Sequence, residues 1–373
     1  MNSNESFYYL ALALIPGLGT TRIHQLTGLH GGLPSGLFRL PRSQLRRSLS
    51  DEIASCIAGG WAATAAESVL KEAETKGIAI TSIADDRYPH LLRAIHDPPV
   101  ILYSLGDFQI AQQAAIAIVG ARRASVYGRQ VTQRLAREVA ETGLAVVSGL
   151  ARGIDCYAHL GALEAGGKTV AVMGNGVDVV YPRENRKVYE GVREKGCIVS
   201  EFPMGSYPAP QNFPIRNRII SGLSYGTLIV EASEFSGSLI TARLTLEQNR
   251  ELWAVPGNIT SPGSYGPNYL IKQGARIVLD RQDILEGLPL YVLDQLRLAA
   301  QPEPSSCAKA DLSPEEESLL AALPVDASIA FDTLLDRLRL DLPQLNQSLL
   351  RLEMKGLIRQ LPGRRYCRVY PAD

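Results

Sequence analysis

The 373-residue sequence contains little cysteine, and the five cysteines that it has are widely scattered. They are Cys56, Cys156, Cys197, Cys307 and Cys367. None forms a C-x-x-C pair and their number is odd, so the pattern indicates neither a zinc site nor a disulfide framework. We expect buried, reduced thiols and no metal site.

The sequence also lacks long hydrophobic runs and an excess of one charge. No apolar run approaches the ~18 residues that span a bilayer, and residues 1–7 lack the basic region that begins a secretory signal. Basic and acidic side chains number 38 each, so a surface that binds nucleic acid must be local. Residues 111–223 do contain a local excess, with 14 basic and nine acidic side chains. We expect a cytoplasmic protein with no membrane partner.

Two segments in this basic region have the pattern strand, glycine turn, helix. The apolar runs 116–119 and 144–147 end at Gly120 and at Ser148-Gly149, and helical patterns follow. Such turns present free backbone N–H groups and the positive end of a helix dipole, which attract anions. Arginines lie in or beside both turns, which favours a phosphate-binding face. The alternative is an ordinary doubly wound sheet whose glycines only permit tight turns.

The rest of the central region continues the alternation. Strands are predicted at 78–83, 100–103, 116–119, 144–148, 168–173, 197–201, 226–231, 251–255 and 275–279. Helices are predicted at 126–142, 154–166, 185–195, 214–223 and 238–249, with a glycine-rich loop between 255 and 275. This order predicts an α/β fold, in which a Rossmann-like, mostly parallel sheet is covered by helices on both faces. The first two strands should extend the sheet or cap its edge.

The two ends of the chain predict smaller domains. Residues 1–77 are helical, and the turn P-G-L-G at 16–19 resembles a helix-hairpin-helix element, although Arg22 and His24 are the only basic residues near it. A tight turn that only packs explains it equally well. Residues 78–300 form the core domain and 301–311 have linker composition. Residues 312–373 give three helices and a two-stranded hairpin, which is a winged-helix pattern. Such modules usually bind DNA, and a protein-binding or purely structural role is the alternative.

Eight segments together carry a family resemblance. They are A-I-V-G-A-R-R-A-S-x-Y-G (117–128), V-S-G-L-A-R-G-I-D-x-x-A-H (147–159), V-M-G-N-G-V-D-V-V-Y-P (172–182), S-E-F-P (200–203), F-P-I-R-N-R-I-I-S-G-L-S (213–224), V-E-A (230–232), S-G-S-L-I-T-A (236–242) and A-V-P-G-N (254–258). Their order and spacing resemble the DNA-processing protein A (DprA/Smf) family over about residues 80–288. Pro267 departs from the family pattern and removes one backbone donor.

The resemblance implies a binding protein rather than an enzyme, with no cofactor. It would grip single-stranded DNA in a sequence-tolerant way, protect incoming DNA during natural transformation, and load the RecA recombinase. A homodimer and a single-strand-binding protein are the further partners that it implies. The residues expected to bind the strand are Arg122, Arg123, Ser148, Gly149, Arg152, Phe213, Arg216, Asn217 and Arg218. Phe213 would stack on bases, or else pack at its helix start under Pro214.

Other polar residues in the motifs have structural interpretations. His159 lies on an apolar helix face and is expected to be a hydrogen-bonded core residue, and Asp155 is expected to cap its helix. Ser236 is expected first as a helix cap and only second as an anion contact. Gly174-Asn175-Gly176 is a weak dinucleotide fingerprint, because it has no third spaced glycine and no partner acid.

Two other functions remain open at this point. Nucleotide phosphoribohydrolases on a related Rossmann-like fold carry P-G-G-x-G-T and a catalytic glutamate, whereas residues 236–241 here read S-G-S-L-I-T. A regulator that binds double-stranded DNA through the winged helix alone is the third possibility.

Overall fold

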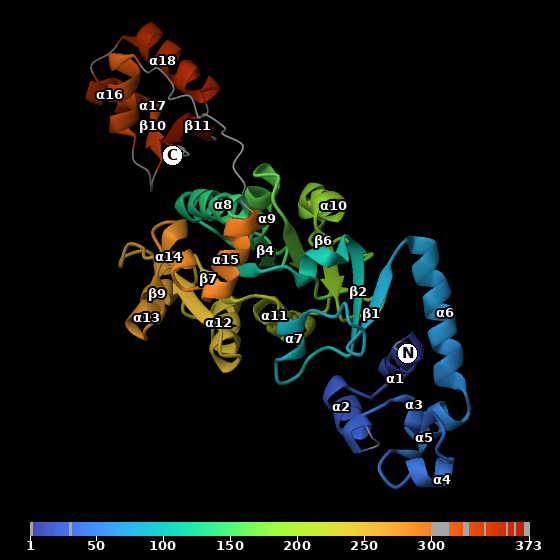
Figure 1. Ribbon diagram of the computed structural model, residues 1–373. Coiled ribbons are helices and arrows are strands. Elements are labelled where there is room, and N and C mark those ends of the chain that lie inside the picture. Colours follow the sequence, from blue (N-terminus) through green and yellow to red (C-terminus); the bar gives the residue numbers. More distant parts are fainter. Residues whose placement is uncertain are drawn as a thin grey trace.

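The computed structural model describes residues 3–29, 32–299, 313–323, 328–338, 341–355, 357–361 and 363–368. It consists of a central α/β unit, an N-terminal group of helices beside one edge of the sheet, and a small C-terminal unit (Figure 1). The linker expected at 301–311 lies outside the described residues.

The central unit contains a mostly parallel sheet, as the alternation of elements predicted. Its strands are β1 (Ala79–Ser82), β2 (Ile101–Gly106), β3 (Ala115–Val119), β4 (Ala145–Ser148), β5 (Thr169–Val172), β6 (Cys197–Ser200), β7 (Gly226–Ile229), β8 (Glu251–Ala254) and β9 (Arg276–Ile277). The nine strands are arranged in the order β1-β2-β6-β5-β4-β3-β7-β8-β9. β2 runs antiparallel to both of its neighbours, and the pairs from β6 to β9 are parallel. The first two strands therefore extend one edge.

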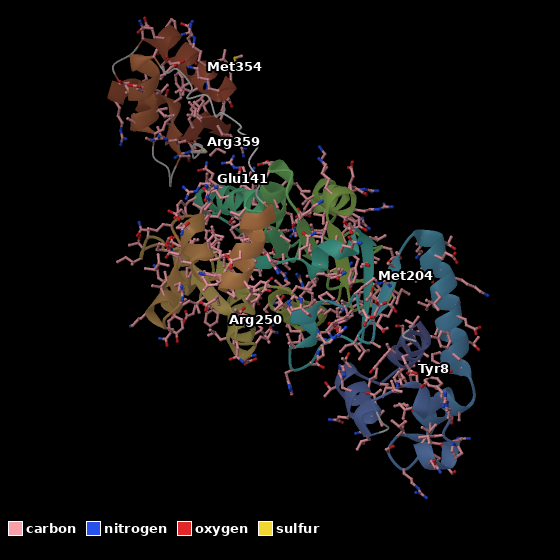
Figure 2. The ribbon with its side chains drawn as sticks, viewed as in Figure 1. Tyr8, Glu141, Met204, Arg250, Met354 and Arg359 are labelled. Atoms are coloured by element: carbon pink, nitrogen blue, oxygen red, sulfur yellow. The ribbon has the colours of Figure 1, made fainter. Side chains whose placement is uncertain are left out.

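Helices cover both faces of the sheet because its strands are apolar on both sides. One face carries α8 (Val126–Glu141), α9 (Ile154–Glu164) and α10 (Arg186–Lys195), and the other carries α7 (His90–Arg93), α11 (Asn212–Gly222) and α12 (Gly237–Glu247). Alternate residues of β3 serve the two faces: Ile116 and Ile118 pack with Leu135 of α8, whereas Val119 packs with Ile219 of α11. Figure 2 shows the side chains of both layers.

The strand order reverses at β3. This strand pairs with β4 on one side and with β7 on the other. The loops that follow β3 and β7 therefore leave the same edge of the sheet in opposite directions, and a crevice forms between them. Ligands of open α/β sheets bind at such reversal points.

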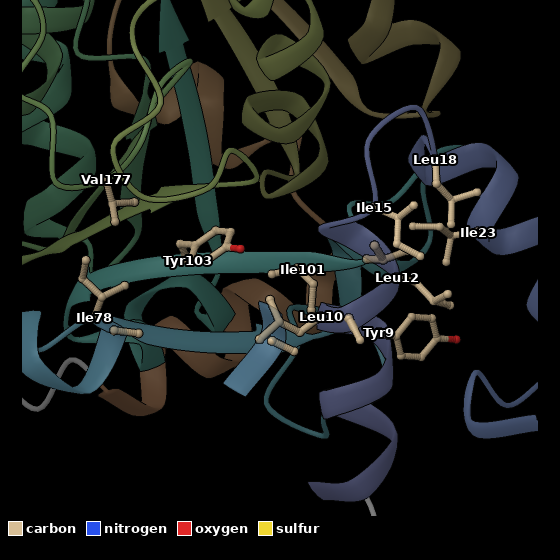
Figure 3. Close-up of a cluster of buried hydrophobic side chains, with 14 of the residues drawn as sticks. Tyr9, Leu10, Leu12, Ile15, Leu18, Ile23, Ile78, Ile101, Tyr103 and Val177 are labelled. Atoms are coloured by element: carbon tan, nitrogen blue, oxygen red, sulfur yellow. The ribbon is translucent and has the colours of Figure 1, made fainter. Parts of the chain in front are cut away.

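Six N-terminal helices pack beside β1 and β2. They are α1 (Ser3–Ala13), α2 (Thr20–Leu29), α3 (Ser35–Phe38), α4 (Arg42–Leu45), α5 (Asp51–Ala58) and α6 (Trp61–Lys76). Figure 3 shows Leu10 of α1 beside Ile101 of β2. The side chains flanking the P-G-L-G turn contact protein: Arg22 donates to the Ser48 carbonyl, and His24 Nε2 lies 2.8 Å from the Pro98 carbonyl oxygen. These contacts favour the packing interpretation of the turn.

No helix in the described part of the chain is by itself long and apolar enough to cross a membrane. The pair α5 and α6, bent by 64°, meets that criterion together, by length and composition only.

The C-terminal unit has the predicted three helices and hairpin, with one short strand more. It comprises α16 (Pro314–Ala322), β10 (Ile329–Ala330), α17 (Phe331–Leu338), α18 (Leu342–Met354), β11 (Ile358–Leu361) and β12 (Arg365–Arg368). Leu319, Leu334, Leu345 and Tyr366 form its core.

The loop expected between residues 255 and 275 contains a helix, α13 (Tyr265–Lys272). Pro267 lies in its first turn, where a backbone N–H has no partner within the helix, so the proline is tolerated there. The prediction of an uninterrupted loop was therefore wrong. α14 (Arg281–Leu285) and α15 (Leu290–Ala299), which the sequence analysis did not predict, follow β9.

Candidate nucleic-acid interface

A pocket of about 630 Å³ opens where the strand order reverses, at the carboxyl ends of β3 and β7. Its walls come from the turn after β3, the first turns of α11 and α12, and the segment before α13. They include Arg122, Arg123, Asp155, Phe213, Arg216, Asn217, Ser236, Ser238 and Gly263. Five of the nine residues expected to bind DNA thus face one pocket, although their positions in the sequence are up to 95 residues apart.

Phe213 presents a half-buried aromatic ring at the start of α11. The guanidinium carbon of Arg122 lies 5.3 Å from the centre of this ring. The Tyr181 ring stacks on it at 5.6 Å with an angle of 27° between the planes. A Cβ atom at Gly174 would come within 2.8 Å of Phe213 Cδ1, so the ring rests on the backbone there. An exposed cation beside an aromatic ring can bind a phosphate and a base together.

Arg216 is a buried cation without hydrogen-bond partners for two of its nitrogens. Only 3% of the residue is exposed, and neither Nε nor Nη1 has a partner among the described residues. Burial lowers the pKa of Arg216 to about 10, while nearby Asp155 raises it and Arg122 lowers it. The side chain therefore remains charged at neutral pH. A buried guanidinium with free donors at a pocket wall is suited to bind an anion.

The second glycine turn supports Arg216 rather than binding an anion directly. The Gly149 N–H donates to Asp155 Oδ2 at 3.2 Å, so this amide is already engaged. A Cβ atom at Gly149 would overlap the Arg216 guanidinium, which explains why glycine is needed there. Ser148 is fully buried and donates to the Ile118 carbonyl at 2.6 Å. The Gly149 amide and Ser148 thus have partners within the protein, and Gly149 also lines a smaller cavity beside Phe213, so their contact with the strand stays a prediction.

Two of the predicted arginines are held in ion pairs. Arg218 donates from Nη2 to Glu201 Oε2 at 2.7 Å and from Nε to the Asp97 carbonyl at 2.9 Å. It is 9% exposed and lies outside the pocket walls, so its position indicates a structural role rather than the expected DNA contact. Arg152 is exposed at the rim, where its Nη2 donates to Glu184 Oε2 at 2.9 Å. Contact with a phosphate would require this exposed pair to open.

The structural roles predicted for His159 and Ser236 are found in the structure, whereas the role predicted for Asp155 is not. His159 is fully buried and its Nδ1 lies 2.7 Å from Thr169 Oγ1, which confirms a core role. Ser236 caps α12 by accepting from the Ser238 N–H, also as predicted. Asp155 does not cap α9, because the N-cap residue is Gly153 and Asp155 is the second residue of the helix. Burial raises the pKa of Asp155, while Arg216 and the N–H groups of the glycine turns lower it, so this carboxylate holds the turns and the buried arginine.

Sequence reasoning missed three residues of the site. Tyr181 stacks on Phe213, and Asn175 lines a smaller cavity beside the same ring. Glu231, which is 5% exposed, accepts from the Ser125 N–H at 2.9 Å and also from its hydroxyl, and so fixes the arginine turn after β3. An acid directly after a buried strand was a usable signal for Glu231, whereas Tyr181 had none. Among the described residues no group of three or more His, Cys, Asp or Glu side chains could hold a metal ion.

Comparisons with known proteins agree with this architecture. The family model of DNA recombination-mediator protein A matches residues 79–289, and that of the DprA winged helix domain matches residues 301–364. Protein Smf of Escherichia coli is 41% identical over 288 residues, which are 76% of this chain and 76% of that protein. DNA processing protein DprA of Bacillus subtilis is 42% identical over 222 residues, 59% of this chain and 75% of that protein.

Two solved structures share the fold. DNA processing protein A from Streptococcus pneumoniae aligns with a TM-score of 0.62 at 31% identity, covering 76% of this chain and 98% of that one. The Helicobacter pylori protein, whose structure concerns its single-stranded DNA binding mode, aligns with a TM-score of 0.51 at 30% identity, covering 59% and 96%. The winged helix and the Rossmann-like sheet predicted from the sequence are thereby confirmed. This chain belongs to the family of DNA recombination-mediator protein A, which includes the proteins named DprA and Smf.

Proposed function

We propose that this protein binds single-stranded DNA without requiring a defined sequence, protects incoming DNA during natural transformation, and loads the RecA recombinase onto it. The observation that carries the proposal is the pocket in which the buried Arg216 has free donors beside the Arg122–Phe213 pair. Arginines attract phosphates of any sequence, and a flat ring stacks on any base. The single-stranded DNA binding mode of the Helicobacter pylori relative supports it.

A binding role rather than an enzymatic one is supported by how Asp155 in the pocket wall and Glu231 behind the turn after β3 are engaged. Asp155 accepts the Gly149 N–H and lies near Arg216, and Glu231 accepts from Ser125. Neither carboxylate is free to act as the catalytic acid or base that a nucleotide phosphoribohydrolase requires. Incubation with nucleoside monophosphates should therefore release no base, and release of base would favour the enzyme.

The test of strand binding is a mobility-shift titration of the full chain with poly-dT and with a duplex of equal length. We expect tighter binding to the single strand, both with and without residues 301–373. Preference for the duplex that disappears with this deletion would instead show a winged-helix regulator. Loading of RecA is tested on strands coated by single-strand-binding protein, where the protein should shorten the delay before RecA filaments form. No acceleration at saturating protein would confine the function to protection of DNA.

The homodimer is supported by an exposed apolar edge. β9 is the last strand of the sheet, and Ile277 in this strand and Leu279, two residues further on, are 47% and 66% exposed. An unpaired strand edge with apolar side chains is suited to pair with a second copy. Light scattering should give a dimer mass for the wild type and a monomer mass for Ile277→Asp; a monomeric wild type would contradict the proposal. We place the protein in the cytoplasm, where RecA and incoming single strands would meet it.

A further inference from the structure

A basic surface lies on the N-terminal helices, around α4. Residues 6–50 contain five arginines and no acidic side chain, whereas residues 51–77 contain five acidic and two basic side chains. Figure 1 shows α4 at the end of this group of helices that is farthest from the sheet. A concentration of one charge on part of a neutral chain produces a local positive potential. We call these five exposed residues the arginine face: Arg22, Arg39, Arg42, Arg46 and Arg47.

Contacts within the unit hold three of these arginines close together. Arg42 Nη2 lies 2.7 Å from Asp51 Oδ2, and Arg46 Nε lies 3.0 Å from Asp51 Oδ1, so both arginines meet one carboxylate. Arg22 of α2 donates to the carbonyl of Ser48, two residues after Arg46. The arginine face is therefore one surface that joins α2 to α4.

Folding does not account for this concentration of charge. The side chains of Arg42, Arg46 and Asp51 are 52%, 59% and 50% exposed, and ion pairs this exposed contribute little to stability. The Arg39 and Arg47 side chains have no hydrogen-bond or ion-pair partner in the part of the chain that the structure describes. Because two arginines share a single carboxylate and two others have none, the arginine face keeps a net positive charge that an external anion can neutralise.

The chemistry of the arginine face fits a phosphate backbone rather than bases. Among the described residues of the range 6–50, no Phe, Tyr or Trp side chain is exposed, so a single strand would gain no stacking there. A duplex does not need stacking, and it carries one negative charge for about every 1.7 Å of its axis, a higher density than a single strand has. Duplex DNA is therefore the better match.

We propose that the arginine face binds the phosphate backbone of duplex DNA without reading its sequence. This site is separate from the pocket beside Phe213 and goes beyond the proposed binding of single strands. With both sites occupied, one protein holds a single strand in the pocket and a duplex on its N-terminal helices.

The test is a titration of the full chain with a blunt duplex of about 30 base pairs and with poly-dT, over a range of salt concentrations. Arg46→Gln combined with Arg47→Gln removes two charges and keeps the pair between Arg42 and Asp51. We expect about ten-fold weaker binding to the duplex, and a slope of log affinity against log salt concentration that falls by about 0.9 for each lost phosphate contact. Affinity for poly-dT should stay the same, because the pocket is intact.

Two further variants serve as controls. Arg193→Gln combined with Arg281→Gln removes two exposed arginines of the central unit, each paired with a glutamate, and should leave the slope for the duplex unchanged. Arg46→Lys combined with Arg47→Lys keeps the charge and should bind the duplex nearly as the wild type does, since counterion release depends on charge.

An unchanged duplex slope in the glutamine variant, with thermal unfolding showing that it folds, would overturn the proposal. If that variant instead lost binding to phosphatidylserine vesicles, the arginine face would belong to a membrane contact. Weakened binding to poly-dT and duplex alike would also overturn it, because the two sites would then not be separate. A wild type that binds the duplex through the arginine face but does not bind poly-dT would contradict only the proposed function.

Discussion

Arg216 and Arg218 lie two residues apart on α11 and have opposite surroundings. Arg218 is held by Glu201 and by the Asp97 carbonyl, whereas the Nε and Nη1 donors of Arg216 have no partner among the described residues. Residues two apart on a helix face different directions, which lets one helix place one arginine in the core and the other at the pocket. The contrast separates a structural role from a binding role within one turn.

Arg216→Met should weaken binding to poly-dT by about ten-fold or more, because a charge-assisted bond to phosphate is lost. Its melting temperature should fall less than it would on loss of an arginine held by direct side-chain hydrogen bonds, because Asp155 loses the nearby charge of Arg216 but keeps the backbone N–H groups that bind it. The measurements are a fluorescence-anisotropy titration and thermal unfolding. Loss of stability without loss of affinity would assign Arg216 to the core.

Arg218→Met should give the reverse result. Removing one partner of a buried pair leaves Glu201 uncompensated and costs about 3 to 5 kcal/mol of stability. At a temperature where the variant is folded, its affinity for poly-dT should equal that of the wild type. Weaker binding by the folded variant would return Arg218 to the strand-binding surface.

Arg122→Ala should weaken single-strand binding and lower its dependence on salt. Each phosphate contact on a single strand contributes about 0.7 to the slope of log affinity against log salt concentration. Arg193→Ala is the matched control, because Arg193 is an exposed arginine two residues before the end of α10 and pairs only with Glu190 among the described residues. The control should leave the slope unchanged, and an unchanged slope in Arg122→Ala would remove Arg122 from the interface.

Sequence patterns predicted the sheet because its signals are local. Buried strands such as 116–119 read as short apolar runs, and α8 shows its buried face through Val131, Leu135 and Val139. α13 was missed because Gly266 and Pro267 resemble a loop, and only its first-turn position makes the proline compatible with a helix.

The site was predictable in its residue types but not in their partners. The motif containing Phe213, Arg216, Asn217 and Arg218 gave no sign of which arginine Glu201 would bind. That choice depends on the packing of α11 against the loop after β6, which joins segments distant in sequence. Gly149 was expected to offer its N–H to an anion, and only the fold shows that Asp155 already accepts it.

His159 predicts a loss of stability in acid. Thr169 Oγ1 donates to the Val146 carbonyl, so it accepts from His159 Nδ1–H, and the imidazole is neutral. Burial, with a contribution from Arg216, lowers the pKa of His159 to about 3. The unfolded chain takes up this proton below an ordinary pKa of about 6.5, so stability should fall as pH falls from about 6.5 towards 3. His159→Gln, which cannot take up the proton, should show a shallower fall of melting temperature over that range; an identical fall would show that other groups cause it.

An experiment can decide whether Phe213 stacks on bases or packs in the core, because stacking affects binding affinity and packing affects stability. Stacking on a base contributes about 1 to 3 kcal/mol to binding, whereas loss of a fully buried phenylalanine costs about 3 to 5 kcal/mol of stability. The ring is only half-buried, between Arg122 and Tyr181, so Phe213→Ala should lower the melting temperature slightly.

The same variant should weaken poly-dT binding by roughly ten-fold or more, since the flat surface for the base is gone. Phe213→Trp should restore part of the affinity, because tryptophan keeps a flat face and the outer pocket has room for a larger ring. A tightly packed ring would instead tolerate tryptophan no better than alanine, because an enlarged side chain strains a filled core. A destabilised Phe213→Ala protein that binds poly-dT with full affinity would therefore assign the ring to packing, and the strand would have to be gripped by Arg122 and Arg216 alone.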